Sequence, residues 1–185
     1  ITTGSGADTF NGSTASTLDT DDTIDGGAGT DTLSATISAV ESIRPAISNV
    51  ENIKLTATGA LTFDARDVSG VTTYTSESST AAITINYATA VSDLTIKSNT
   101  GNAAATLHTF NVTDTAIVGT RDAMTITLDN IDADTVVTLT DAGGTTNELE
   151  TVTLNSIGLA NTLATLNTSS VETTILKVTG NKSLT

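Results

Sequence analysis

Residues 26–34 read GGAGTDTLS, in which three glycines and an aspartate lead into one leucine. The stretch matches the nine-residue pattern G-G-x-G-x-D-x-U-x, where U is a large apolar residue, at every defined position. The glycine-rich half of this pattern forms a tight turn whose backbone needs positive φ angles, and the apolar residue then begins a short buried strand. Two such units make one coil of about 18 residues, so the stretch predicts a β-solenoid.

Two related nine-residue windows precede this stretch. Residues 3–11, TGSGADTFN, depart from the pattern only at their first residue, and residues 17–25, TLDTDDTID, keep an aspartate and an isoleucine in phase but lack the glycines. In a coil built of two units, turns on the same edge stack on every second unit. We therefore expect the turn at residues 4–8 to stack on the turn at residues 26–31, with Asp22 on the opposite edge.

The rest of the chain is dominated by short alternating segments. Threonine, valine and isoleucine are common, and their branched β-carbons favour strands. Period-two alternation of apolar and polar residues recurs in NIKLTAT (52–58), ALTFDA (60–65), AITINYA (82–88), DLTIKS (93–98), TFNVTD (109–114), AMTITLD (123–129), TVVTLTD (135–141) and ETVTLNS (150–156). Because similar segments return at steps of about 20 residues, we predict an all-β, right-handed parallel β-solenoid. The alternative is a β-sandwich, which would carry stronger turn signals and more aromatic core residues.

An apolar residue followed by glutamate recurs as a second phrase. It occurs in AVESI (39–43), NVENIKL (49–55), LETVTL (149–154) and SVETTIL (170–176). We expect this phrase to begin a strand, with the glutamate turned outward at a corner of the coil.

The composition limits the classes of partner. The chain has 185 residues, 21 of them acidic and 7 basic, with a formal net charge of −14 and no cysteine. Nucleic acid is not an expected partner, because phosphate binding needs lysine and arginine. Membrane insertion is not expected either, because no apolar run reaches the roughly 18 residues of a membrane helix. The acidity favours cation binding, since a metal relieves repulsion between carboxylates. A bound metal can also stabilise a fold that has no disulfides. The chain begins at Ile1 and not at methionine, so we expect a segment of a longer protein.

Calcium is the cation that the glycine-aspartate turns fit best. It takes about 6–8 oxygen ligands in flexible geometry, and two stacked turns can supply them from carboxylates and main-chain carbonyls. Asp8 and Asp31 are expected to share one ion. On the opposite edge Asp22 is the expected ligand, with Asp19 and Asp21 as helpers. The candidate metal ligands are therefore Gly4, Gly6, Asp8, Asp19, Asp21, Asp22, Asp25, Gly27, Gly29 and Asp31, with a second tier in the turn DNIDAD (129–134) of Asp129, Asp132 and Asp134.

Two other interpretations of the acidic stretch remain open. Residues 21–32 place Asp21, Thr23 and Asp25 at the first, third and fifth positions of an EF-hand-like loop. The twelfth position is Thr32, where an EF-hand has a bidentate glutamate, and no helices are expected on either side. The second alternative is a glycine-rich acidic loop that binds no metal.

An enzyme is not expected. The single histidine, His108, lies on an alternating strand, where we expect it on the solvated face. No nucleophile elbow of the form G-x-S-x-G is present. The arginines are Arg44, Arg66 and Arg121, and no ladder of aromatic residues is available for stacking sugars, as a polysaccharide-cleaving solenoid would need.

The motif at residues 26–34, together with GSGADTFN before it, resembles the RTX repeats of calcium-dependent β-rolls that are exported by type I secretion. Its continuation into a threonine-rich, cysteine-free acidic chain with the phrase NVENIKLTATG resembles RTX-type surface-layer proteins and large adhesins of Gram-negative bacteria. This resemblance implies an extracellular location at the bacterial cell surface, calcium as the cofactor, and lateral assembly with copies of the same chain.

The resemblance also implies an organisation along the chain. We expect residues 1–36 to form a calcium β-roll and residues 37–185 to form a threonine-rich solenoid that continues from it. A structural segment of a self-assembling surface layer is the favoured function, because the aromatic residues that adhesive surfaces use are sparse. The alternative is an adhesin segment that binds a glycan or host surface, and a cell-surface polysaccharide is a further candidate partner.

Overall fold

The structure is a computed structural model that describes residues 1–14, 16–98, 107–131, 134–143, 148–169 and 171–185. The described residues form short strands, joined by turns and by one 3-10 helix, η1 (Asp114–Ile117). The strands are β1 (Thr9–Gly12), β2 (Thr23–Asp25), β3 (Thr32–Ile37), β4 (Glu41–Ile43), β5 (Ala46–Ser48), β6 (Asn52–Ala57), β7 (Leu61–Asp64), β8 (Thr73–Glu77), β9 (Ile83–Ala88), β10 (Asp93–Lys97), β11 (Leu107–Val112), β12 (Ala123–Asp129), β13 (Thr135–Asp141), β14 (Thr151–Ile157), β15 (Leu163–Asn167) and β16 (Ile175–Gly180).

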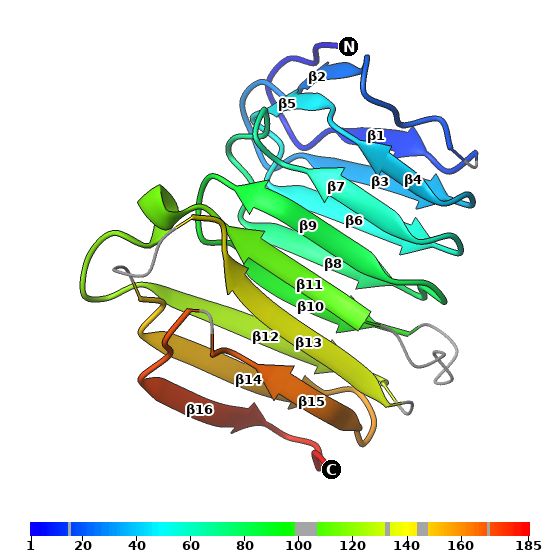
Figure 1. Cartoon of the computed structure of the whole chain (residues 1–185). Helices are drawn as coiled ribbons and strands as arrows, with labels where there is room; N and C mark the ends of the chain where they lie inside the picture. Colours follow the sequence, from blue (N-terminus) through cyan, green and yellow to red (C-terminus); the bar gives the residue numbers. More distant parts are fainter. Residues whose placement is uncertain (15, 99–106, 132–133, 144–147, 170) are drawn as a thin grey trace.

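The strands form stacked parallel sheets. One sheet has the order β1-β3-β6-β8-β10-β12-β14-β16, the facing sheet has the order β15-β13-β11-β9-β7-β4, and β2 pairs with β5. Every pairing between these strands is parallel. Figure 1 shows the coils stacked along one axis, with the two termini at opposite ends. The predicted parallel β-solenoid is confirmed, and the antiparallel β-sandwich alternative is wrong.

The strand register shows one repeated coil. Equivalent positions in the eight-stranded sheet are Phe10, Leu33, Ile53, Tyr74, Leu94, Ile126, Leu154 and Val178. From Leu33 to Leu94 the step is 20 or 21 residues, which confirms the predicted coil length. The next step, from Leu94 to Ile126, is longer, because it takes in η1 and residues 99–106, which lie outside the described part of the chain.

A narrow apolar core fills the space between the facing sheets. In β3 every second residue is buried, as the alternating sequence predicts, and the same alternation runs through β12, β13 and β14. Three aromatic rings meet inside: the centroids of Phe63 and Tyr74 are 6.2 Å apart, and those of Tyr74 and Phe110 are 5.9 Å apart. The remaining buried apolar side chains are largely aliphatic, as a thin coil requires.

The prediction that His108 faces solvent is wrong. Its side chain is 3% exposed and lies in the core, whereas its neighbour Leu107 is 46% exposed. The phase of β11 is set by Phe110 and Val112, which both point inward. Because alternate residues of a strand share a face, His108 must point inward with them. Burial then lowers the pKa of the imidazole to about 4.

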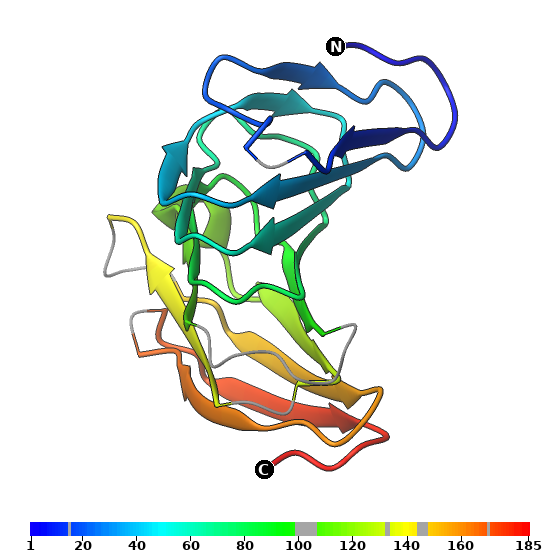
Figure 2. The ribbon, with the colours of Figure 1, turned by 90° about the vertical axis from the view of Figure 1, so that its right-hand side faces the viewer.

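The C-terminal end of the solenoid leaves its outermost strand, β16, uncovered. Leu176 and Val178 of β16 are in register with the buried Val152 and Leu154 of β14. They are nevertheless 57% and 62% exposed, because no described strand lies beyond β16 in the sheet. Figure 2 shows this strand, in red, at the end of the stack where the C-terminus lies.

Candidate metal centre

The two glycine-rich turns stack directly on one another. The backbone N–H of Ala28 donates to the carbonyl of Gly4 at 2.9 Å, and that of Gly6 donates to the carbonyl of Ala28 at 2.7 Å. Ser5 and Ala28 form a parallel bridge at the same place. The predicted stacking of the turn at residues 4–8 on the turn at residues 26–31 is therefore confirmed.

Glycine is required where the two turns touch. A Cβ atom added to Gly27 would lie 2.2 Å from the carbonyl oxygen of Gly4, and one added to Gly29 would lie 1.9 Å from that of Gly6. Both residues also have positive φ angles, 81° and 143°, which side chains disfavour. The glycines of the pattern thus allow both the turn and the close approach of successive coils.

Asp31 is the buried acid of this region. Its exposed fraction is 0%, and its Oδ1 accepts the backbone N–H of Asp8 at 2.7 Å. Its Oδ2 is also buried and accepts no hydrogen bond from the described residues. Asp8 itself is half-buried, so the two predicted partners meet through the backbone of Asp8 and the carboxylate of Asp31.

Glu51 is a polar partner of this site that is not among the candidate metal ligands expected from the motif. Its Oε2 accepts the backbone N–H of Asp31 at 2.7 Å. Glu150 makes the equivalent bond, at 2.6 Å, to the backbone N–H of Asp122. Both glutamates are half-buried and turn back onto the preceding coil, so the expectation that they point outward is wrong for these two. The recurring phrase of an apolar residue followed by glutamate marks both positions in the sequence. Spacing alone, however, does not give the direction of a side chain.

Other aspartate carboxylates of the first turns accept hydrogen bonds from nearby backbone N–H groups. Asp22 Oδ2 accepts the N–H of Asp19 at 2.9 Å, and Asp19 Oδ1 accepts the N–H of Asp21 at 2.9 Å. These bonds form a self-contained acidic turn at the solvent-exposed edge, of the kind that aspartate side chains commonly make. The carboxylate of Asp25 is different, because it accepts hydrogen bonds from Asn49 Nδ2 at 2.8 Å and from the turn backbone, which hold its pKa below the usual value.

The second-tier acids are not brought together with the glycine turns. Asp129 ends β12 and Asp134 is exposed before β13, while Asp132 lies outside the described residues. In the part of the chain that the structure describes, no three acidic or histidine side chains gather closely enough to hold a metal by themselves. A cation at any of these places would therefore draw part of its coordination from main-chain carbonyls or water, as calcium commonly does.

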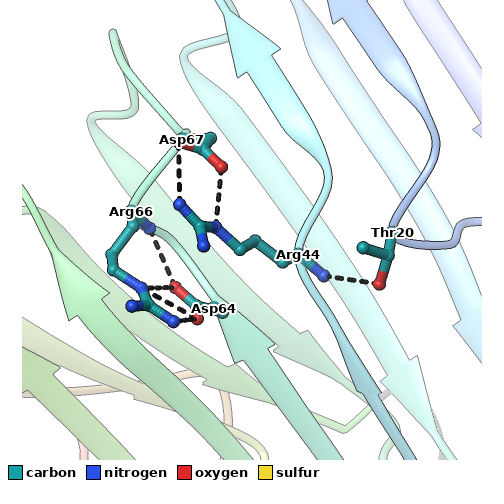
Figure 3. A network of polar contacts seen from close by, with 5 residues as sticks. All are labelled: Thr20, Arg44, Asp64, Arg66 and Asp67. Carbon is teal, nitrogen blue, oxygen red and sulfur yellow. Dashed lines mark hydrogen bonds and ion pairs between the residues drawn. The ribbon is translucent and has the colours of Figure 1, made fainter.

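Another polar network lies on the surface beside β5 and β7 (Figure 3). Arg44 Nε donates to Asp67 Oδ2 at 2.7 Å across adjacent coils, and Arg66 forms an ion pair with Asp64 that lowers the pKa of that carboxyl. The Arg66 guanidinium also lies 4.7 Å from the ring centroid of Tyr87. The side chains of Arg44 and Asp67 are 42% and 48% exposed, so their ion pair contributes little to stability. In the other pair Arg66 is 49% exposed, but Asp64 is only 13% exposed.

The comparisons with known proteins leave the chain without an assigned family. None of the described segments forms a helix with the length and hydropathy needed to span a membrane. Searches of protein-family models, curated proteins and solved structures found no match to this chain.

Proposed function

We propose that this chain is a calcium-binding structural segment of a self-assembling extracellular protein, of the kind that forms bacterial surface layers. The proposal is non-enzymatic. The observation that carries it is the Asp31 carboxylate, which is fully buried beneath stacked glycine turns and has one oxygen without a hydrogen-bond donor among the described residues.

The physical argument starts from the burial of Asp31. A buried charged oxygen without a partner is costly, and proteins relieve this cost by pairing it or by coordinating a metal. The possible metal ligands around Asp31 are carboxylate and carbonyl oxygens, which suit a hard cation such as calcium. A cation there would also offset part of the net charge of −14.

The residues that would hold the ion are Asp31, the main-chain carbonyls of the stacked turns, and Asp8 at the half-buried side. The carbonyl of Gly4 already accepts one hydrogen bond, but a carbonyl has a second lone pair. An ion bound across the two turns would fix one coil to the next. Because the turn geometry does not exist in an unfolded chain, the binding free energy would become folding free energy.

Circular dichroism and thermal unfolding, with calcium and with a chelator, test the proposal. Calcium should raise the melting temperature, and Asp31→Asn should remove most of that rise. Asp93→Asn is the matched control, because it removes one charge while its amide oxygen can still accept the N–H of Thr125 that Asp93 Oδ1 accepts in the native protein. Identical melting with calcium and with chelator would reject calcium binding, and equal effects of both substitutions would reject the role of Asp31.

Self-assembly is tested separately. Electron microscopy of the protein in millimolar calcium should reveal ordered sheets or filaments that a chelator disperses. Monodisperse particles under both conditions would contradict a surface-layer role.

One observation favours the adhesin alternative. Tyr87 is partly exposed, has a positive φ of 56°, and lies at the bulge where β9 departs from the register of β11. An exposed aromatic ring beside Arg66 is the type of surface that contributes strongly to binding. Binding of the wild-type chain to a glycan array, lost in Tyr87→Ala, would favour the adhesin; no binding to the array would leave the surface-layer function preferred.

A further inference from the structure

The glycine-rich turn at residues 26–31 has a neighbour on each side. The turn at residues 4–8 lies against it from the preceding coil, and residues 49–51 lie against it from the following coil. Residues 49–51 read Asn-Val-Glu and lie outside the nonapeptide pattern. The following coil therefore contacts the turn through a different sequence.

Two oxygens converge over the bare Cα of Gly26. A Cβ atom at that position would lie 1.9 Å from the main-chain carbonyl oxygen of Asn49 and 2.7 Å from Asp31 Oδ2. Gly26 is itself buried. A side chain at this position would collide with both oxygens, so only glycine allows them to approach the backbone here. The Asp31 oxygen concerned is the one that accepts no hydrogen bond from the described residues.

The carbonyl of Asn49 is held in place from both sides. Asn49 has a left-handed backbone with φ of 53°, and its side-chain amide donates to Asp25 Oδ1 at 2.8 Å. Val50, the next residue, is fully buried in the core. The backbone at residue 49 is thus anchored by a hydrogen bond on the turn side and by packing on the core side, which fixes the direction of its carbonyl.

Glu51 adds a second carboxylate to the same place. Its Oε2 accepts the N–H of Asp31, so the carboxylate lies against the backbone of the residue whose Oδ2 accepts no hydrogen bond from the described residues. The Asp31 carboxylate of the turn is therefore accompanied by one carboxylate and one carbonyl from the following coil, those of Glu51 and Asn49. Together the carboxylates carry the two negative charges that balance a divalent cation, and calcium accepts this mixture of ligands with water completing its shell.

We propose that residues 49–51 complete a calcium site on the far side of the glycine turn, with Asp31 Oδ2, the Asn49 carbonyl and the Glu51 carboxylate as ligands. This inference rests on the proposed calcium function and places the ion that Asp31 binds on the side of the turn that faces Asn49 and Glu51. It makes the phrase NVEN the sequence that joins the calcium-binding turns to the threonine-rich coils, with the ion bound between the two.

Isothermal titration of the wild-type chain and three variants with calcium chloride tests this assignment. Glu51→Gln removes the charge but keeps an oxygen that can accept the N–H of Asp31. Glu150→Gln is the matched control, because Glu150 accepts the N–H of Asp122 at the same corner of a later coil. Asp31→Asn reports on the whole site. Thermal melting in chelator establishes that all the variants fold like the wild type.

We expect Glu51→Gln to weaken calcium binding by at least about tenfold, since even indirect partners of a metal cost that much, and Glu150→Gln to leave it unchanged. If Asp31→Asn weakens binding and Glu51→Gln does not, the inference is wrong and the proposed function stands with the ion between the two glycine turns. If both glutamate variants weaken binding equally, the effect is one of net charge and the inference is wrong. If the wild-type chain binds no calcium, both the inference and the proposed function are wrong.

Discussion

Acidification should destabilise this protein through its buried histidine. His108 lies inside the solenoid on β11, and burial lowers the pKa of the imidazole from its ordinary 6.5 to about 4. Because the folded pKa lies below the unfolded pKa, the unfolded chain binds the proton first as the pH falls. The stability that neutral His108 provides is therefore complete above the ordinary pKa and is lost progressively between the two values.

The size of this loss of stability follows from the shift in the pKa of His108. One pKa unit corresponds to about 1.36 kcal/mol, so the shift from 6.5 to about 4 is worth about 3 kcal/mol in total. By linkage, about 2 kcal/mol of this is lost between about pH 7 and pH 5. Asp25 and Asp64 have lowered folded pKa values, so the stability they provide is lost only as the pH falls below about their ordinary 3.8. They do not contribute in the same window.

Urea unfolding at a series of pH values, in the presence of chelator, measures this loss. His108→Leu places an apolar side chain of similar size among the core residues and removes the titrating group, so its free energy of unfolding should be nearly constant between about pH 7 and pH 5. The wild-type protein should lose stability over the same range. Parallel losses in the two proteins would show that the acid sensitivity arises elsewhere and would refute the argument.

Further predictions concern the turns, a buried amide and the surface. Gly29→Ala should loosen the stacked turns, since its methyl group would lie 1.9 Å from a carbonyl of the preceding coil; faster hydrogen exchange in the first coil measures this, and wild-type exchange rates would contradict it. Asn161→Ala should cost about 3 kcal/mol in chemical unfolding, because the buried amide accepts the N–H of Ile131 at 2.7 Å and donates to three oxygens. Arg44→Ala should cost less than about 1 kcal/mol in the same assay, because its ion pair with Asp67 is exposed; a larger loss would show that the pair acts as a clamp between coils.

The sequence predicts the features of the coil that depend on backbone conformation. The stacking of the two glycine turns follows from the positions of Gly27 and Gly29, since only glycine permits both the positive φ and the close contact. The strand alternation in β3 follows in the same way from the period of two. These features depend on residue type and spacing, which the sequence contains directly.

The direction of a side chain, and its contacts with the neighbouring coils, are harder to predict from the sequence. Alternation alone predicts a polar residue such as His108 on the solvated face, and only the packing of Phe110 fixes the phase. Glu51 was expected to point outward, although its carboxylate turns back to the N–H of Asp31. The direction of Glu51 depends on Asp31, 20 residues away in the preceding coil, which a local pattern does not describe.

The parallel ladder that joins each coil to the next also determines how the molecule would respond to mechanical tension. Its inter-strand hydrogen bonds run along the stack, and the two termini lie at opposite ends of that stack. A pull between the termini would therefore load one layer of bonds at a time, and coils would peel away in sequence from the weakest end. Each coil of about 20 residues would release about 70 Å of extended chain. A chain built in this way would yield in small repeated steps under load, and a bound ion at the first coils would mark the layer that yields last.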